Sequence, residues 1–578
     1  MRYAFERFQA EITNALLATG LIAPEELALQ VPRAASVSAD LALPCFEPAR
    51  RRGLQPAVYA ARLAEAARAH LPAAGFVGSL QAVGGFVNFA LNAPGYTAAV
   101  LAEVEQADGA YGWGDEGLGR TVVVDYSSPN VAKRMHVGHI RSTIIGQALA
   151  NLLRALEYRV VADNHLGDWG TQFGVLIAAI HRWGKPEGAG EALLEELESR
   201  YARYAGAAQH DPALAGAARS WSLRLEQGDP QARALWHEIV ELTRQSNQRS
   251  YERLGVHFDT ELGESFYAPL TGAVIDDALE RGVAEHGEDG AVVVALDDLP
   301  AFLLRRSDGG TLYHTRDLAA VGFRVRSYQP ARLIYVVDQR QELSFRQLFA
   351  AARALGYAPP EVALIHVPFG TVFGPNGQPL STRRGNMVYL EALLDEAVAR
   401  ARAIVADKTL GRGADLTEEE QERIAEAVGV GAVIYNDLYQ DTRRNLTLDW
   451  DRMLSLEGNS AAYLQYTHAR CRSILRRAGG LPEQYDPALL VEPAEAAVVR
   501  ALGQLPQAIR TAANSYAPNV LADWLYGTAR QFAAFYRDCP VLDAPPARRA
   551  ARLHLVAATA QALRNGLALL GVAAPERM

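Results

Sequence analysis

A lysine lies just before a pair of histidines in the stretch SSPNVAKRMHVGHIRST, residues 127–143. The chain has 57 Lys and Arg residues, and Lys133 is one of its three lysines. An ammonium is a compact point charge on a flexible stem and guanidinium is a planar fork, so the two are not interchangeable against a moving triphosphate. The lysine therefore predicts a phosphate contact. The alternative is chance, since the adjacent Arg134 indicates that arginine is tolerated here.

The two histidines lie where a strand gives way to a helix. Backbone N–H groups and the helix dipole make a helix N-terminus positive, which suits phosphate. His136 and His139 can donate hydrogen bonds to one anionic group, and Gly138 lets a flat ring such as adenine approach the backbone. Charge grows on the α-phosphoryl group of ATP when a carboxylate attacks it, and fixed donors stabilise that charge. The pattern predicts an adenylation site, although two histidines in a polar loop often have no function.

A second phosphate-binding element is expected after the last strand of the same sheet. The stretch GTVFGPNGQPLSTRRGNMVYL, residues 370–390, combines glycines with hydroxyl and guanidinium groups suited to anions. Its candidate ATP contacts are Ser381, Thr382, Arg383 and Gly385. The stretch could also be an exposed loop. Two such elements flanking one sheet favour a nucleotide site.

A sheet must bring these loops together. Residues 121–127, TVVVDYS, are typical of a buried strand, residues 140–158 have helical apolar spacing, and a second strand is expected within residues 159–170. This order predicts a parallel pair joined by a right-handed crossover, and hence a Rossmann-like sheet. Strand-like runs that would complete it return at 332–337 and 361–369.

The length of 578 residues predicts several domains. We expect a multidomain protein with a Rossmann-like α/β catalytic domain that carries an insertion, a small N-terminal α+β domain and a C-terminal all-α helix bundle. The expected boundaries are 1–110 for the N-terminal domain, 111–390 for the catalytic domain with its insertion at about 175–300, 391–450 for a helical connector and 451–578 for the bundle.

Composition excludes several classes of protein. Hydrophobic residues make up 49% of the chain and charged residues 21%, with a net charge of −9, which is typical of a globular protein and not of a disordered acidic chain. The sequence shows neither a signal peptide nor an apolar run of membrane-spanning length, so we expect a cytoplasmic protein without a membrane partner. Cys45, Cys471 and Cys539 are too scattered for a disulfide framework or a zinc site, and we expect no tightly bound metal.

The tail has a local excess of positive charge. From residue 451 onward there are 14 Arg against 10 Asp and Glu. Nucleic-acid binding needs such a local basic face, and a solvated arginine-rich helical surface is the alternative. Aromatic side chains among the arginines suit stacking on unpaired bases, although most are expected in the bundle core: Tyr516, Trp524, Tyr526 and Tyr536.

Several strings resemble one known family. HVGH resembles the HIGH signature of class I aminoacyl-tRNA synthetases, and PLSTRRGN resembles a degenerate form of their KMSKS loop. SSPNVAKRMHVGHIRST, DNHLGDWGTQFG, YHTRDLAA, GNSAAYLQYTHAR and LLGVAAPERM resemble the arginyl-tRNA synthetases specifically. The resemblance implies an arginine–tRNA ligase with L-arginine, Mg-ATP and tRNA(Arg) as its substrates and partners, and a requirement for tRNA before arginine is activated. We expect a monomer.

The resemblance also assigns roles to residues. Pro379 and Thr382 stand where the class I loop has lysines, and Lys133 would supply the missing charge beside the catalytic His136 and His139. The implied arginine-binding residues are Asn130, Asn164, Tyr313, Asp317 and Gln341. Phe86 and Asn88 match positions implied to read a D-loop base of the tRNA. The anticodon-domain string D-A-L-R is partial here, because Gln561 replaces its Asp.

Three alternatives remain open. The chain could be another H-x-G-H nucleotidyltransferase that adenylates a small substrate without RNA, which would leave the helix bundle unexplained. It could be a tRNA-binding descendant of a synthetase that no longer catalyses, although both histidines are intact. It could also be a class I synthetase for another amino acid.

Overall fold

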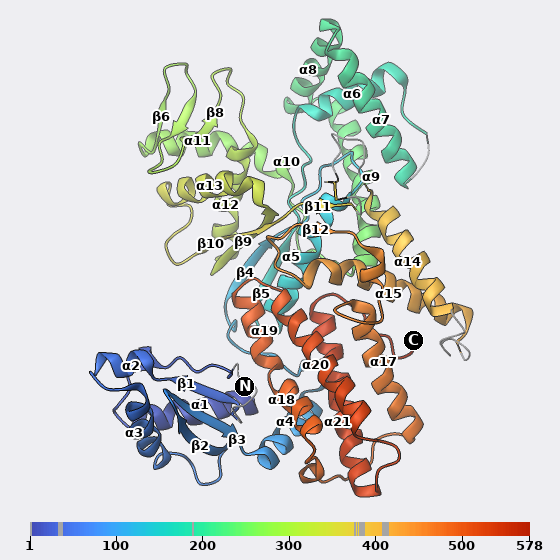
Figure 1. Cartoon of the computed structure of the whole chain (residues 1–578). Coiled ribbons are helices and arrows are strands. Elements are labelled where there is room, and N and C mark those ends of the chain that lie inside the picture. The colour runs from blue at the N-terminus through green and yellow to red at the C-terminus, as the bar shows by residue number, and fades with distance from the viewer. Residues whose placement is uncertain are drawn as a thin grey trace.

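A four-stranded parallel sheet lies at the centre of the molecule, with the N-terminal domain, the insertion and the helical bundle arranged around it (Figure 1). The structure is a computed structural model, and it describes residues 3–32, 39–187, 190–374, 377–378, 380, 388–406 and 416–578. The strand order is β10-β9-β4-β5, and every neighbouring pair is parallel. The strands are β4 (Thr121–Asp125), β5 (Arg159–Asp163), β9 (Arg332–Asp338) and β10 (Ala363–Phe369).

The central strands are buried, which explains their continuous runs of valine and isoleucine. Helix α5 (Val137–Ala155) connects β4 to β5, as the strand–helix–strand order predicted. The carboxyl ends of all four strands meet at one edge because the strands are parallel. Loops that follow β4, β5 and β9 therefore converge there, and such an edge is where open α/β sheets bind ligands.

Between β5 and β9 the chain forms two further units (Figure 1). Four helices pack around their own apolar cluster, which includes Trp236 and Ile239. These helices are α6 (Thr171–Trp183), α7 (Gly190–Ala208), α8 (Pro212–Glu226) and α9 (Pro230–Leu254). A small antiparallel sheet follows, flanked by helices: α10 (Glu264–Tyr267), α11 (Thr271–Glu280), β6 (Ala284–His286), β7 (Val292–Val294), β8 (Phe302–Arg305) and α12 (Tyr313–Tyr328). The far end of α9 returns to the main core, where Tyr251 and Leu254 are buried.

The N-terminal domain is a three-stranded antiparallel sheet covered by helices, as its mixed pattern predicted. Its elements are α1 (Ala4–Ala18), β1 (Leu41–Pro44), α2 (Phe46–Arg51), α3 (Pro56–Arg68), β2 (Val77–Val83), β3 (Phe86–Leu91) and α4 (Ala93–Ala107). The central strand of this sheet is β3, in the order β1-β3-β2.

The last third of the chain is helical, as its periodicity predicted. After α13 (Glu342–Ala354) and β11 (Val372–Phe373) come α14 (Leu390–Ala406), α15 (Glu418–Leu438), β12 (Leu446–Thr447), α16 (Trp450–Met453), α17 (Ala461–Ala478), α18 (Pro493–Gly503), α19 (Leu505–Asn514), α20 (Asn519–Asp538) and α21 (Pro546–Leu569). None of the helices in the described part of the chain is long and apolar enough to cross a membrane.

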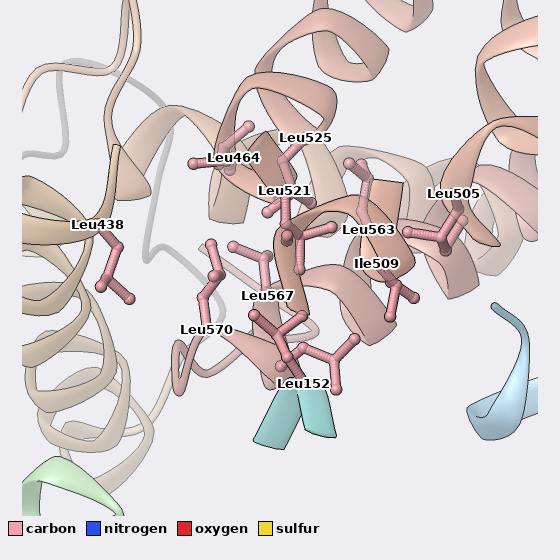
Figure 2. Packing of buried hydrophobic residues seen from close by; sticks show 14 of the residues in the cluster. Leu152, Leu438, Leu464, Leu505, Ile509, Leu521, Leu525, Leu563, Leu567 and Leu570 are labelled. Carbon is pink, nitrogen blue, oxygen red and sulfur yellow. The ribbon is translucent and has the colours of Figure 1, made fainter. Parts of the chain in front are cut away.

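The bundle and the catalytic sheet share one apolar core. Figure 2 shows Leu152 of α5 beside Leu567 of α21, and both side chains are buried in the same cluster as the leucines of α20. The N-terminal domain joins the same core through Tyr111, whose hydroxyl donates a hydrogen bond of 3.0 Å to the carbonyl oxygen of Leu502. The three cysteines are buried and free. A continuous core of this kind couples the bundle mechanically to the helix that begins at the paired histidines.

Candidate active site

The paired histidines form the first turn of α5, where their side chains are held by backbone groups. His136 is the N-cap residue, and its Nδ1 accepts a hydrogen bond of 3.0 Å from the Gly138 N–H. The Nδ1 atom of His139 accepts one of 3.3 Å from the His136 N–H, and the two rings stack with centroids 4.0 Å apart. Since both Nδ1 atoms accept, the neutral rings carry their protons on Nε2.

The protonation of these rings follows from their surroundings. Burial, together with the charges of His136 and Lys133, lowers the pKa of His139 to about 3. Burial and Lys133 also lower the pKa of His136. Both imidazoles are therefore neutral at neutral pH, and each offers one Nε2–H donor. Two such donors on one helix turn are suited to stabilise charge that develops on a phosphoryl group.

Arg134 and Lys133 are adjacent in the chain but have different surroundings. The Nε of Arg134 lies 3.1 Å from a carboxylate oxygen of Glu198, and its guanidinium carbon lies 3.7 Å from the centre of the Tyr389 ring. Lys133 is exposed and has no hydrogen bond or ion pair with any residue in the described ranges. Both line a cavity of about 210 Å³ that also includes His136. Lys133 is thus a cation available to a ligand beside the paired histidines, whereas Arg134 is committed to internal contacts.

The loop between β4 and α5 has an unusual backbone. Ser127, Ser128 and Ala132 have φ values of +72°, +47° and +63°, a region that non-glycine residues rarely adopt. Each of their amides donates to a side-chain oxygen on a different element: Ser127 to Ser142 on α5, Ser128 to Asn164 after β5, and Ala132 to Thr243 on α9. Strained backbone of this kind persists where its surroundings over-determine it, and it is concentrated at functional sites.

The two ends of the second predicted phosphate element, residues 370–390, are described, and its C-terminal end contacts the first element. The Val137 N–H donates to the Val388 carbonyl at 3.1 Å, and the Leu390 N–H donates to the Met135 carbonyl at 3.0 Å. At the N-terminal end of the element, β11 pairs with β12 in parallel. The two stretches that the sequence singled out thus meet at the start of α5. The candidate ATP contacts themselves lie outside the described residues: Ser381, Thr382, Arg383 and Gly385.

Arg141, one turn beyond the histidines, ties three parts of the molecule together. Its guanidinium is fully buried and its Nη2 lies 2.8 Å from Asp437 of α15. The same side chain donates to the carbonyl oxygens of Gly370 at 2.8 Å and Arg444 at 2.9 Å. A Cβ at Gly370 would lie 2.6 Å from the Arg444 carbonyl oxygen, so the two segments can approach this closely only because residue 370 is a glycine. The contacts fix α5 against α15 and against the chain that leads to the second phosphate element.

Asp317 provides a carboxylate near the carboxyl edge of the sheet. It lies on the second turn of α12, and burial raises its pKa to about 6, with His165 opposing the rise and Glu264 and Asp125 adding to it. Within the described residues its ion-pair partner is His165, whose Nε2 lies 3.7 Å away, and no Lys or Arg pairs with it. Asp125, in contrast, is paired with the buried Arg324 at 2.7 Å. Among the described residues, therefore, no strong cation forms an ion pair with Asp317.

His165 is a candidate functional residue that our sequence reasoning missed. Both of its ring nitrogens are buried and have no hydrogen-bond partner among the described residues. It directly follows Asn164 at the carboxyl end of β5, inside the string DNHLGDWG. This position beside a predicted arginine-binding residue was the sequence signal that could have identified it. Buried polar atoms without partners are uncommon in folded proteins. The His165 ring is therefore available to a ligand bound beside Asp317.

The remaining predicted arginine-binding residues differ in exposure. Tyr313 is 49% exposed and lies one turn before Asp317 on α12. Gln341 is exposed and ends the short 3-10 helix that follows β9. Asn130 is exposed and pairs with Gly167 through a backbone bridge. Asn164 is completely buried, and its side chain contacts the Ser128 amide, Tyr251 and Glu261.

No group of three or more His, Cys, Asp or Glu residues within the described ranges could hold a metal ion.

The predicted RNA contacts lie in the outer domains. Phe86 is half-buried and meets the exposed ring of Phe46 edge-on at 5.2 Å, whereas Asn88 is only 7% exposed. In the bundle, Trp524 donates its indole N–H to a backbone carbonyl, and Tyr516 bonds to Arg332. These two are internal contacts, as expected for most of the aromatic residues.

An aromatic–arginine surface occurs on α17 and α20. Arg470 lies 4.6 Å from the ring centre of Tyr466 and 5.1 Å from that of Tyr536, which is 41% exposed. Arg530 lies 5.9 Å from the ring centre of Tyr526. Two of the four aromatic residues predicted from sequence belong to this surface, while Tyr466 was not foreseen. The surface presents rings and guanidinium planes of the kind on which unpaired bases stack.

Comparisons with known proteins agree with this architecture. The catalytic-domain model of the class I tRNA synthetases (R) matches residues 109–450, and the DALR anticodon binding domain matches residues 464–578. An arginine–tRNA ligase of Chloroflexus aggregans is 58% identical over 582 aligned residues, with 100% of both chains covered. One from Cronobacter sakazakii is 37% identical, with 98% of each chain covered.

Solved structures give the same result. The arginyl-tRNA synthetase of Thermus thermophilus matches with a TM-score of 0.84 and 26% sequence identity, covering 99% of this chain and 100% of that one. The resemblance predicted from HVGH and the longer strings is confirmed by these matches. The chain therefore belongs to the arginyl-tRNA synthetase family of class I aminoacyl-tRNA synthetases.

Proposed function

We propose that the protein is an arginine–tRNA ligase, which activates L-arginine with ATP to arginyl-adenylate and transfers the arginine to the 3' end of tRNA(Arg). AMP and pyrophosphate are the other products. The observation that carries the proposal is the carboxylate of Asp317 beside His165, an anionic group without a Lys or Arg partner among the described residues. A planar guanidinium supplies both the missing charge and donors in a geometry that a carboxylate accepts.

The other arginine contacts belong to the same proposed pocket. Tyr313, one turn before Asp317, is placed to pack on the substrate side chain, and Gln341 to donate to or accept from it. Asn130 would hold the α-amino and α-carboxylate groups from the strained loop. Asn164 belongs to the same set, and it also holds the loop through the Ser128 amide. These residues orient the substrate carboxylate toward the first turn of α5.

The chemical step uses positioning and charge stabilisation, because the nucleophiles belong to the substrates. The arginine carboxylate attacks the α-phosphorus of ATP, and pyrophosphate leaves. His136 and His139 direct Nε2–H groups to the phosphoryl oxygens, and Lys133 places its ammonium on the departing phosphates. Adenine would lie over Gly138, which has no side chain. ATP would arrive as its magnesium complex, in which the ion keeps most of its water.

The second predicted phosphate element closes the nucleotide site. Ser381, Thr382, Arg383 and Gly385 would contact the phosphates through hydroxyls, backbone and guanidinium. The hydrogen bonds of Val388 and Leu390 to the histidine loop support this placement, because they hold the end of the element beside α5. Lys133 would then replace the lysines that this element lacks.

The tRNA would contact the outer domains. Phe86 and Asn88 would read a base of the tRNA elbow, with the exposed Phe46 ring beside them. The Arg470 and Tyr536 surface suits the unpaired anticodon bases. The terminal ribose hydroxyl of the tRNA takes the arginyl group from the adenylate. We also propose that tRNA must bind before arginine is activated, and that the protein works as a monomer in the cytoplasm.

The test is exchange of labelled pyrophosphate into ATP, with arginine, lysine or glutamine, and with or without tRNA. We expect exchange with arginine alone among the three amino acids, and only when tRNA is present. Exchange with lysine or glutamine but not arginine would disprove the assigned substrate. Absence of exchange with all three, combined with tight tRNA binding, would instead identify a non-catalytic tRNA-binding protein.

A further inference from the structure

The residue before Lys133 is held by the insertion and not by the catalytic sheet. Ala132 has a φ of +63°, and its N–H donates a hydrogen bond of 3.0 Å to the Thr243 hydroxyl on α9. Thr243 is 1% exposed, and its hydroxyl also donates to the Ile239 carbonyl at 2.9 Å. The buried hydroxyl thus accepts one hydrogen bond, from Ala132, and donates one, to Ile239. The Ala132 amide is buried as well, so this oxygen is its acceptor in place of water.

A second contact from the same helix reaches the start of the loop. Eight residues after Thr243, or about two turns along the same face, the Tyr251 hydroxyl lies 2.9 Å from the Ser127 hydroxyl. Ser127 is another of the residues with positive φ. Helix α9 therefore holds the loop at two points, near its start at Ser127 and in its middle at Ala132. It is itself fixed by the apolar core of the insertion at one end and by the ion pairs of Arg253 with α14 and α15 at the other.

We propose that Thr243 is a positioning residue for Lys133, and that Tyr251 supports the same loop at Ser127. On this view the insertion sets the place of the catalytic ammonium by holding the backbone beside it in its left-handed conformation. The inference rests on the proposed function, because it assumes that Lys133 acts on the phosphates of ATP. It adds a residue from the insertion that contacts neither nucleotide nor arginine.

Substitution of Thr243 by Val tests the hydrogen bond with little change of shape. The variant retains the branched side chain but leaves the buried Ala132 amide without an acceptor, so the loop has to move to satisfy it. A displacement of about 1 Å in a reacting group can reduce a rate by about 100-fold. We expect Thr243→Val to slow adenylate formation by at least about tenfold, with the KM for arginine changed by less than about twofold. Tyr251→Phe should have the same direction and a smaller effect.

Each variant has a matched control elsewhere in the chain. Thr559→Val removes a buried hydroxyl that bonds only to the Leu555 carbonyl of its own helix, and Tyr204→Phe removes a hydroxyl bonded to the Leu214 carbonyl within the insertion. Both should exchange pyrophosphate at about the wild-type rate. Thr243→Ser keeps the hydroxyl and should restore most of the rate even where Thr243→Val folds poorly. A slow, fully folded Thr243→Ser protein would overturn the proposal.

The decisive readout is the combination with Lys133→Ala. If Thr243 acts through Lys133, adding Thr243→Val to Lys133→Ala should slow adenylate formation by less than about twofold further, whereas independent effects would multiply. Multiplied effects, or a Thr243→Val rate within about twofold of wild type, would overturn the inference while leaving the proposed function intact. Absence of arginine-dependent exchange in the wild-type protein would instead refute the proposed function.

Discussion

Replacement of Asp317 by Asn separates the recognition of arginine from the stability of the fold. The change removes the negative charge and keeps the size of the side chain. Truncating one partner of a buried charged hydrogen bond costs about 2–5 kcal/mol. We take about 3 kcal/mol because the Asp317 side chain is 32% exposed. The KM for arginine should therefore rise by about 100-fold.

The same substitution should stabilise the protein in the absence of ligand. Burial raises the pKa of Asp317 to about 6 from an ordinary value of 3.8. The folded protein then binds the proton more tightly than the unfolded chain, so ionisation of Asp317 lowers the free energy of unfolding as the pH rises through about 4 to 6. The difference between the two pKa values would correspond to a loss of about 3 kcal/mol in the free energy of unfolding. Because the side chain is partly exposed, solvent screening reduces this loss to about 1 kcal/mol. Asp317→Asn should thus unfold at higher urea concentration than wild type at pH 7.5.

The pH dependence provides the control on mechanism. In the wild-type protein the KM for arginine should rise as the pH falls below about 6, because protonated Asp317 cannot pair with a guanidinium. The other charged groups near this carboxylate, His165, Glu264, Asp125 and Arg324, remain in the variant, so a rise that persists in Asp317→Asn would not come from protonation of Asp317. Asp308→Asn, which alters an exposed carboxylate paired with Arg306, should match wild type in every assay. An arginine KM within about threefold of wild type in Asp317→Asn would refute the proposed pocket.

Three further substitutions test other parts of the molecule. Lys133→Ala should slow adenylate formation by at least about tenfold in single-turnover assays, with little change in arginine affinity. Lys133→Arg should fail to restore the rate. Full restoration by arginine would mean that charge alone suffices. Asp437→Ala leaves the Arg141 guanidinium buried without its counter-ion. The free energy of unfolding measured in urea should therefore fall by about 3–5 kcal/mol. A loss below about 1 kcal/mol would contradict a structural role for the pair. Arg470→Ala should weaken tRNA binding by about tenfold in filter-binding assays. The rate of pyrophosphate exchange at saturating tRNA should stay unchanged. Unaltered tRNA binding would exclude this surface as an RNA contact.

The sheet and its first motif could be predicted from sequence because each depends on local pattern. Strand β4 is a run of β-branched residues buried on both faces, and the histidines follow it within one loop, so period and order were sufficient. The pairing of Arg141 with Asp437 could not be predicted in this way, because the two residues are 296 positions apart and neither belongs to a recognisable spacing. His165 was missed for a similar reason. Its significance depends on the absence of a partner, which only the packed structure defines.

The conformation of the loop before α5 was also beyond sequence reasoning. Glycine is the usual signal for positive φ, yet Ser127, Ser128 and Ala132 adopt it without being glycine. Their amides are satisfied by side chains from α5, from the end of β5 and from α9, three elements that a local pattern cannot bring together. The strain is therefore a property of the assembled fold.

The contrast between Lys133 and Arg134 explains why a chain so rich in arginine uses a lysine here. Arg134 binds Glu198 through Nε and stacks on Tyr389, so its planar guanidinium is fixed by two kinds of contact that an ammonium could not make as well. An arginine at position 133 would carry the same planar guanidinium and could be fixed by any carboxylate or ring within its reach. A lysine, with a compact charge and no planar face, remains available, while the backbone before it is held by Thr243. We infer that the loop fixes the base of the side chain and leaves its charge mobile, which is what a group that follows departing phosphates requires.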